Sequence, residues 1–133
     1  MKEERPVNQQ SEPSRGELEI LKVLWKHGPS TVRTVNDMLN AERNVIYTST
    51  LKTMQIMTEK GMLARDESSM KHVYRALLDE QPTKGLLLDK FLESTFNGSA
   101  TTLLQQLLGN GKTSRDELQE LKSLLDKLEN DQQ

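Results

Sequence analysis

Few residues in this chain could support catalysis or hold a metal ion. Its two histidines, His27 and His72, lie far apart in the sequence and lack metal-ligand spacing. The absence of cysteine excludes disulfides, thiol nucleophiles and thiolate metal sites. Acidic residues such as Glu17 and Asp116 fall at the starts of expected helices, where negative charge is favourable. Because phosphate-binding, dinucleotide-binding and serine-hydrolase motifs are also missing, the sequence predicts no enzyme, no cofactor and no metal site.

A group of short hydroxyl side chains around one lysine could instead contact nucleic acid. Thr48, Ser49, Lys52 and Thr53 follow Tyr47 in a segment with helical periodicity, on the face opposite its apolar residues. Hydroxyls can donate or accept hydrogen bonds at base edges and phosphates, and lysine supplies a mobile cation. The alternative is a plain solvated face, although such a face usually favours Glu and Lys for helix propensity. We predict that these five residues contact DNA.

Further cations that could reach the DNA backbone lie before and after this segment. Arg65, Lys71 and His72 flank a polar turn, where their alternative role is only to keep the protein soluble. Arg33 lies on the side of a preceding short helix that is expected to be exposed, together with Asn36. We predict that these four charged or basic side chains contact DNA as well.

Residues 14–40 are expected to form two helices that position this surface. Ser14 and Glu17 have the capping-box spacing, and leucines recur at helical intervals until Gly28-Pro29 ends the segment. Ser30 is the expected N-cap of a second helix that ends near residue 40. The inward face of this second helix is expected to contain Val32, Val35, Met38 and Leu39.

A third helix carries the hydroxyl cluster on its outer face and ends at Gly61, which supplies a left-handed stop. Its expected inward residues are Leu51, Met54 and Met57, with Ile56 as a further candidate.

Two short extended segments, residues 62–65 and 72–77, surround a polar turn and predict a β-hairpin. Three helices followed by a hairpin over residues 14–80 are typical of a winged helix-turn-helix. Residues 1–13 are polar and contain two prolines, so we expect a disordered tail there. The predicted fold class is mainly α with a small β-hairpin.

Residues 81–133 are expected to form a helical region that pairs two subunits. Gln81-Pro82 is the expected boundary, after which three leucine-rich segments are separated at Asn97-Gly98 and at residues 109–111. About 50 residues cannot hide so many apolar side chains, so a second copy is the simplest partner. The residues expected at this interface are Leu87, Leu88, Phe91, Leu92, Leu103, Leu107, Leu121, Leu124, Leu125 and Leu128.

Composition excludes some classes of protein but does not itself predict DNA binding. The 133 residues carry a formal net charge of −2, which offers phosphate no global attraction. No stretch approaches the roughly 20 apolar residues of a membrane-spanning helix, and the first residues do not resemble a signal peptide. We therefore expect a cytoplasmic protein without membrane insertion.

Several segments together resemble the penicillinase-repressor (BlaI/MecI) family of winged-helix regulators. They are EILKVLW at residues 19–25, TVR at 31–33, YTSTLKTM at 47–54 and EKGML at 59–63. The start of the last expected helix, SRDEL at residues 114–118, is also similar. The resemblance covers about residues 14–130, with the segments in the family's order and spacing.

This resemblance implies a homodimeric repressor that binds palindromic operators upstream of β-lactamase or related genes. It also implies that a membrane-bound sensor protease relieves repression by causing cleavage in the C-terminal region. Where the family has an Asn-Phe cleavage bond, this chain has Gln106-Leu107. The cysteine-rich metal motif of the related copper-responsive repressors is missing. The alternative function is a protein-interaction scaffold that uses the winged helix without binding DNA.

Overall fold

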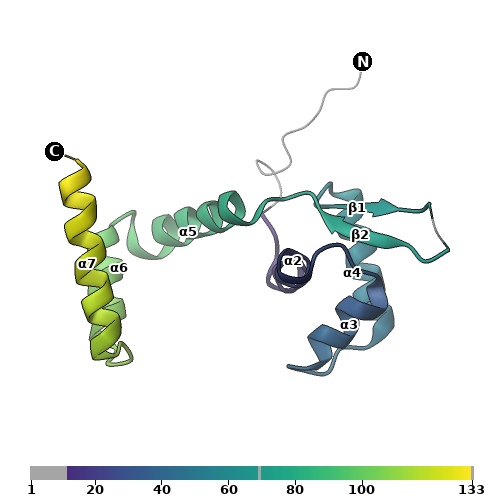
Figure 1. Cartoon of the computed structure of the whole chain (residues 1–133), viewed down its shortest axis with the longest axis horizontal. Coiled ribbons are helices and arrows are strands. Elements are labelled where there is room, and N and C mark those ends of the chain that lie inside the picture. The colour runs from purple at the N-terminus through teal and green to yellow at the C-terminus, as the bar shows by residue number, and fades with distance from the viewer. Residues whose placement is uncertain (1–11, 69, 133) are drawn as a thin grey trace, which may run out of the picture. The chain divides into compact units, whose positions relative to one another are not determined.

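The computed structural model describes residues 12–68 and 70–132, which divide into two units after Leu87 (Figure 1). Most of the predicted disordered tail, residues 1–11, lies outside the described residues. Pro13, the last residue of the predicted tail 1–13, is described and is buried. The described residues are mainly helical and include one two-stranded antiparallel hairpin, which confirms the predicted fold class.

The first unit opens with α2, Arg15–His27, which begins at the predicted capping box. The Ser14 hydroxyl accepts a hydrogen bond from the Glu17 backbone N–H, and the Glu17 carboxylate accepts one from the Ser14 N–H. Gly28 ends the helix with φ 85°, a value that glycine adopts without a Cβ clash, and its N–H donates to the Leu24 carbonyl.

The next helix, α3, spans Val32–Asn40 and begins one residue later than predicted. Thr31 is the N-cap, and its hydroxyl accepts from the Thr34 N–H. Ser30 does not cap the helix because it forms an antiparallel bridge with Tyr74, with N···O distances of 2.9 and 2.8 Å. Met38 was predicted to face inward, but it is 39% exposed because the core contacts of α3 run through residues 32, 35 and 39.

Helix α4, Tyr47–Glu59, is followed by the hairpin strands β1, Leu63–Asp66, and β2, Val73–Ala76. The strands pair in antiparallel register, with Leu63 opposite Ala76. Gly61 has φ 83° and supplies the predicted left-handed stop between α4 and β1. Ile56 is 40% exposed, so the suggestion that it faces inward is wrong.

The core of the first unit lies between α2, α3, α4 and the hairpin. Trp25 packs against its edge, and its indole N–H donates to the Leu78 carbonyl at 2.9 Å. The buried apolar residues are Ile20, Leu21, Leu24, Val32, Val35, Leu39, Met54, Met57, Met62, Leu63, Tyr74 and Leu78.

Helix α5, Glu80–Phe96, continues across the division between the two units. Gln81 and Pro82, the predicted boundary, lie inside its first turn, where proline is tolerated because those N–H groups have no helical acceptor. Thr83 in the next position is buried.

The remainder of the second unit consists of α6, Ala100–Gly109, and α7, Arg115–Asp131. Ser99 and Ser114 cap these helices through their hydroxyls. None of the described residues of α6 and α7 is buried, although both helices are rich in leucine. In the described part of the chain, no helix is both long enough and apolar enough to cross a membrane.

Candidate nucleic-acid interface

The N-terminal half of α4 presents the predicted hydroxyl and lysine cluster at the surface. Thr48, Ser49 and Lys52 are exposed, and Thr53 at the edge of the same face is half-buried. The opposite side of the helix is anchored in the core by residues 50, 54 and 57, all buried. Anchoring one side of α4 in this way fixes which side chains face solvent.

A buried amide holds α4 against α3. Asn36 donates from Nδ2 to the Val45 carbonyl at 3.0 Å and to the Thr50 hydroxyl at 2.8 Å. The prediction that Asn36 is exposed is therefore wrong, because its amide meets polar groups supplied by the following turn and helix. Burial of this amide costs little, since its N–H donors are hydrogen-bonded.

A second asparagine, one helical turn further along α3, fastens the turn between the two helices. Asn40 donates from Nδ2 to the Val45 carbonyl at 2.8 Å, and its Oδ1 accepts from the Val45 N–H at 3.1 Å. Asn40 also donates to the Asn36 carbonyl. Sequence analysis missed this pair, although two asparagines four residues apart before a polar turn were a visible signal.

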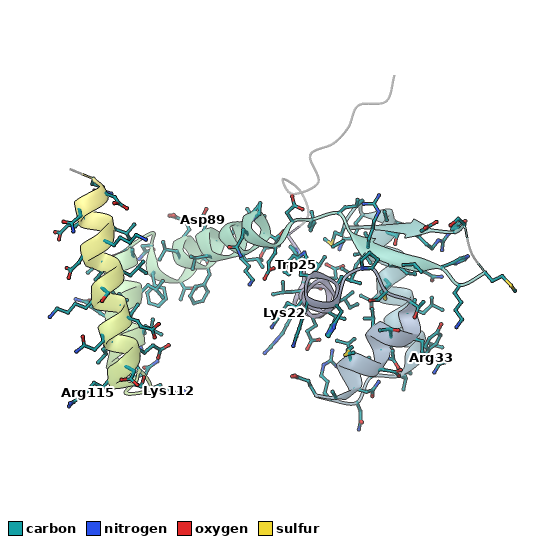
Figure 2. All side chains as sticks on the ribbon, viewed as in Figure 1. Lys22, Trp25, Arg33, Asp89, Lys112 and Arg115 are labelled. Carbon is teal, nitrogen blue, oxygen red and sulfur yellow. The ribbon has the colours of Figure 1, made fainter. Side chains whose placement is uncertain are left out.

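Three elements contribute side chains to a hollow of about 490 Å³ beside α4. Arg33 from α3, Tyr47 from α4, and Lys71 and His72 from the segment before β2 all line it. The Arg33 guanidinium lies over the Tyr47 ring, 4.9 Å from its centroid, which stabilises both side chains through a cation–π contact. Figure 2 labels Arg33 on α3. The fold thus brings together four of the nine predicted DNA-contacting residues around one concavity.

Arg65 lies on β1 and does not line this hollow. Its Nε donates to the Glu67 carboxylate at 2.7 Å. A hydrogen bond with Tyr74 and this pairing with Glu67 raise the pKa of the Arg65 guanidinium. Arg65 is thus already paired with one carboxylate on the hairpin.

Sequence analysis also missed Arg43 in the turn before α4. Its guanidinium pairs with the Glu19 carboxylate of α2 at 2.5 Å, and this hydrogen bond lowers the pKa of Glu19. The exposed pair of Arg43 and Glu19 connects the turn between α3 and α4 to α2.

A family model described as "Penicillinase repressor" matches residues 13–127 of the chain. The chain belongs to the penicillinase repressor family. It is 31% identical over 121 residues to the penicillinase repressor of Bacillus licheniformis, covering 88% of this chain and 91% of that protein. It is 26% identical to the transcriptional regulator BlaI of Mycobacterium tuberculosis, over 86% of this chain and 84% of the relative. It is 20% identical to the methicillin resistance regulatory protein MecI of Mammaliicoccus sciuri, over 90% of this chain and 98% of that protein.

Membership of this family confirms the predicted resemblance and assigns the chain to transcriptional repressors, which are not enzymes. Among the described residues of the repressor, no group of three or more His, Asp or Glu side chains could hold a metal ion.

The predicted subunit-interface residues of this repressor differ in exposure. Leu87, Leu92, Leu103 and Leu121 are half-buried. Leu87 falls in the first unit, whereas the other predicted residues fall in the second. The other six predicted interface residues are about half exposed, with exposed fractions between 49% and 55%. They are Leu88, Phe91, Leu107, Leu124, Leu125 and Leu128.

Proposed function

We propose that this repressor binds two-fold symmetric operator DNA as a homodimer, with the N-terminal half of each α4 in the major groove. The observation that carries this proposal is the exposed Thr48, Ser49 and Lys52 surface on a helix held by the buried Asn36. A polar helix face held rigidly in this way suits base-edge contacts, because an α-helix fits the major groove.

The hollow beside α4 supports backbone contacts on the same face. Arg33, Lys71 and His72 surround it, and hydrogen-bond donors at this place can contact phosphates next to the groove that α4 enters. Such contacts orient the protein on the duplex, whereas the α4 side chains select the sequence.

Dimer formation is supported by the exposed leucines of α6 and α7 and by Leu88 and Phe91 of α5. Apolar surface of this kind is usually covered in a soluble protein, and a two-fold dimer covers the same patch on both subunits. Two recognition helices could then contact major-groove faces about 34 Å apart.

The names of the relatives support a proposal for the regulated genes, and the family resemblance supports one for the release of repression. The names of the relatives refer to penicillinase and to methicillin resistance, so we place the operators upstream of β-lactam-resistance or related genes. Release by a membrane-bound sensor protease is the family expectation for a cytoplasmic repressor of this kind. Gln106-Leu107, the counterpart of the family's cleavage bond, lies within α6 with both side chains exposed.

The test of this function is a salt titration of binding to a promoter duplex, with Lys52→Ala as the variant. Binding should weaken steeply with salt, with a log–log slope of about −0.9 per phosphate contact. Lys52→Ala should lower the affinity and leave the fold intact, since the lysine is exposed.

Lys22→Ala is the matched control, because it removes the same charge from the exposed surface of α2 (Figure 2). Equal affinities for wild type, Lys52→Ala and Lys22→Ala at low salt would contradict the role of Lys52. A protein-interaction scaffold would show no salt-dependent binding to its own promoter.

A further inference from the structure

The residue at the start of α4 breaks two rules of local structure. Ile46 is the N-cap of this helix, and its side chain makes no capping hydrogen bond. The same side chain is 68% exposed. An isoleucine therefore stands where the helix favours a hydrogen-bond acceptor and where solvent favours a polar group.

The described helices α2, α3, α6 and α7 show what this chain uses at the same position elsewhere. Each begins at a serine or threonine whose hydroxyl accepts a backbone N–H of the first turn. An exposed residue that breaks such a local preference, and gains no packing in return, is typical of a functional position.

The position of Ile46 relates it to the α4 surface. It immediately precedes Tyr47 and lines a hollow of about 300 Å³ together with Arg43, Ser49 and Thr53. Ser49 and Thr53 belong to the predicted DNA-contacting face of α4. An apolar side chain thus stands at the edge of an otherwise polar recognition surface.

We infer that Ile46 is a specificity-determining residue that contacts the 5-methyl group of a thymine in each operator half-site. This inference rests on the proposed insertion of α4 into the major groove. The thymine methyl is the apolar group that base pairs present there, whereas the other groups are hydrogen-bond donors or acceptors. An isoleucine can bury that methyl but can form no side-chain hydrogen bond with any base.

The experiment uses the full-length dimer and a duplex that the wild-type protein selects from a random-sequence library. Each thymine is replaced in turn by uracil, which removes only the methyl group. At one thymine position in each half-site, the change to uracil should lower the affinity of wild type about fourfold. This is the effect of burying one methyl-sized group. Ile46→Ala should bind the thymine and uracil duplexes equally.

Two further variants separate this role from a structural one. Ile46→Ser restores a capping hydroxyl, so its thermal unfolding midpoint should rise while the thymine preference is lost. Ile56→Ala removes an exposed isoleucine from the far part of α4 and should keep the preference.

The inference is overturned if the uracil penalty is unchanged in Ile46→Ala, if wild type shows none, or if Ile56→Ala abolishes it equally. A lower midpoint for Ile46→Ser would also count against it, because Ile46 would then serve stability. Failure of wild type to select any duplex would instead refute the proposed function, and the inference with it.

Discussion

At the scale of single residues, a buried carboxamide determines how α3 and α4 meet. Asn36 joins the Val45 carbonyl to the Thr50 hydroxyl, so one side chain connects a helix, a turn and the next helix. Such a contact also specifies geometry, because an amide accepts only a few arrangements of donors and acceptors.

Asn36→Ala should lower the free energy of unfolding by about 1–3 kcal/mol, since a buried hydrogen-bonding group loses its donor. Urea denaturation of the variant measures this change. Asp37→Ala, on the exposed side of the same helix, is the control and should stay within about 0.5 kcal/mol of wild type. Equal stability of both variants would show that the amide contacts contribute nothing.

Sequence reasoning placed Leu21 and Leu24 of α2 in the core correctly, but it missed the buried Ile20 and misplaced Asn36 and Ser30. Helical periodicity identifies apolar faces, whereas the burial of a polar residue depends on which partners the fold supplies. Val45 and Thr50 supply those partners for Asn36. Ser30 and Thr31 are both plausible caps by type, and the bridge from Ser30 to β2 decides between them.

At the scale of elements, the first turn of α2 is tied to the end of α4. Lys60 donates to the buried Glu17 carboxylate at 2.8 Å, while Glu17 also completes the capping box. Burial alone would raise the pKa of Glu17, but the hydrogen bonds from Lys60 and Ser14 and the Lys60 charge outweigh burial and lower it.

A lowered pKa in the folded state means that ionised Glu17 stabilises the fold above its ordinary value of 4.5. This contribution should disappear as the pH falls through the lowered value. Glu17→Gln should therefore cost about 1–2 kcal/mol near neutral pH, less than a fully buried pair because Lys60 is partly exposed.

Urea denaturation at several pH values checks this expectation. The difference in stability between wild type and Glu17→Gln should narrow as the pH falls below 4.5. Glu42→Gln, at an exposed position, should show a much smaller difference. A Glu17→Gln difference independent of pH would contradict the electrostatic explanation.

The hairpin should contribute affinity for DNA but no sequence preference. Arg65→Ala and Lys71→Ala should weaken binding to operator and random duplexes by similar factors, since phosphate contacts position the protein without selecting bases. Parallel titrations of the two duplexes measure both factors. A change in base preference in either variant would mean that the hairpin contacts bases.

The order of the elements was predictable from local signals. A capping box marks the start of α2, a glycine stop marks the end of α4, and two short extended segments around a polar turn mark the hairpin. The exposed cluster on α4 could also be predicted from the sequence, since helical periodicity puts Lys52 on a different face from Met54 and Met57. The hollow was not predictable, because Arg33, Tyr47 and His72 approach one another only through tertiary packing.

At the scale of the whole molecule, dimer formation and operator affinity should fail together. Replacing Leu88 or Phe91 by glutamate would place an unpaired charge in the proposed subunit interface and cost several kcal/mol, on the order of the penalty for a buried charge. The first unit should remain folded, because its core draws on α2, α3, α4 and the hairpin.

Sedimentation should therefore show monomers for these variants and dimers for wild type. Affinity for a full palindrome should fall toward that for a half-site, because the second contact is no longer intramolecular. Lys84→Glu, an exposed charge reversal near the start of α5, controls for added negative charge. A wild-type monomer at micromolar concentration with full operator affinity would contradict the dimer.

Because the chain divides into two units after Leu87, tryptophan fluorescence can follow the first unit by itself. Trp25 is the only tryptophan in the sequence, and its indole contacts the core and the Leu78 carbonyl of the first unit. Its emission should shift to longer wavelength when water reaches the indole ring. Circular dichroism, in contrast, records the helices of both units. Comparing the two signals during unfolding would show whether the second unit melts while the environment of the indole is still intact.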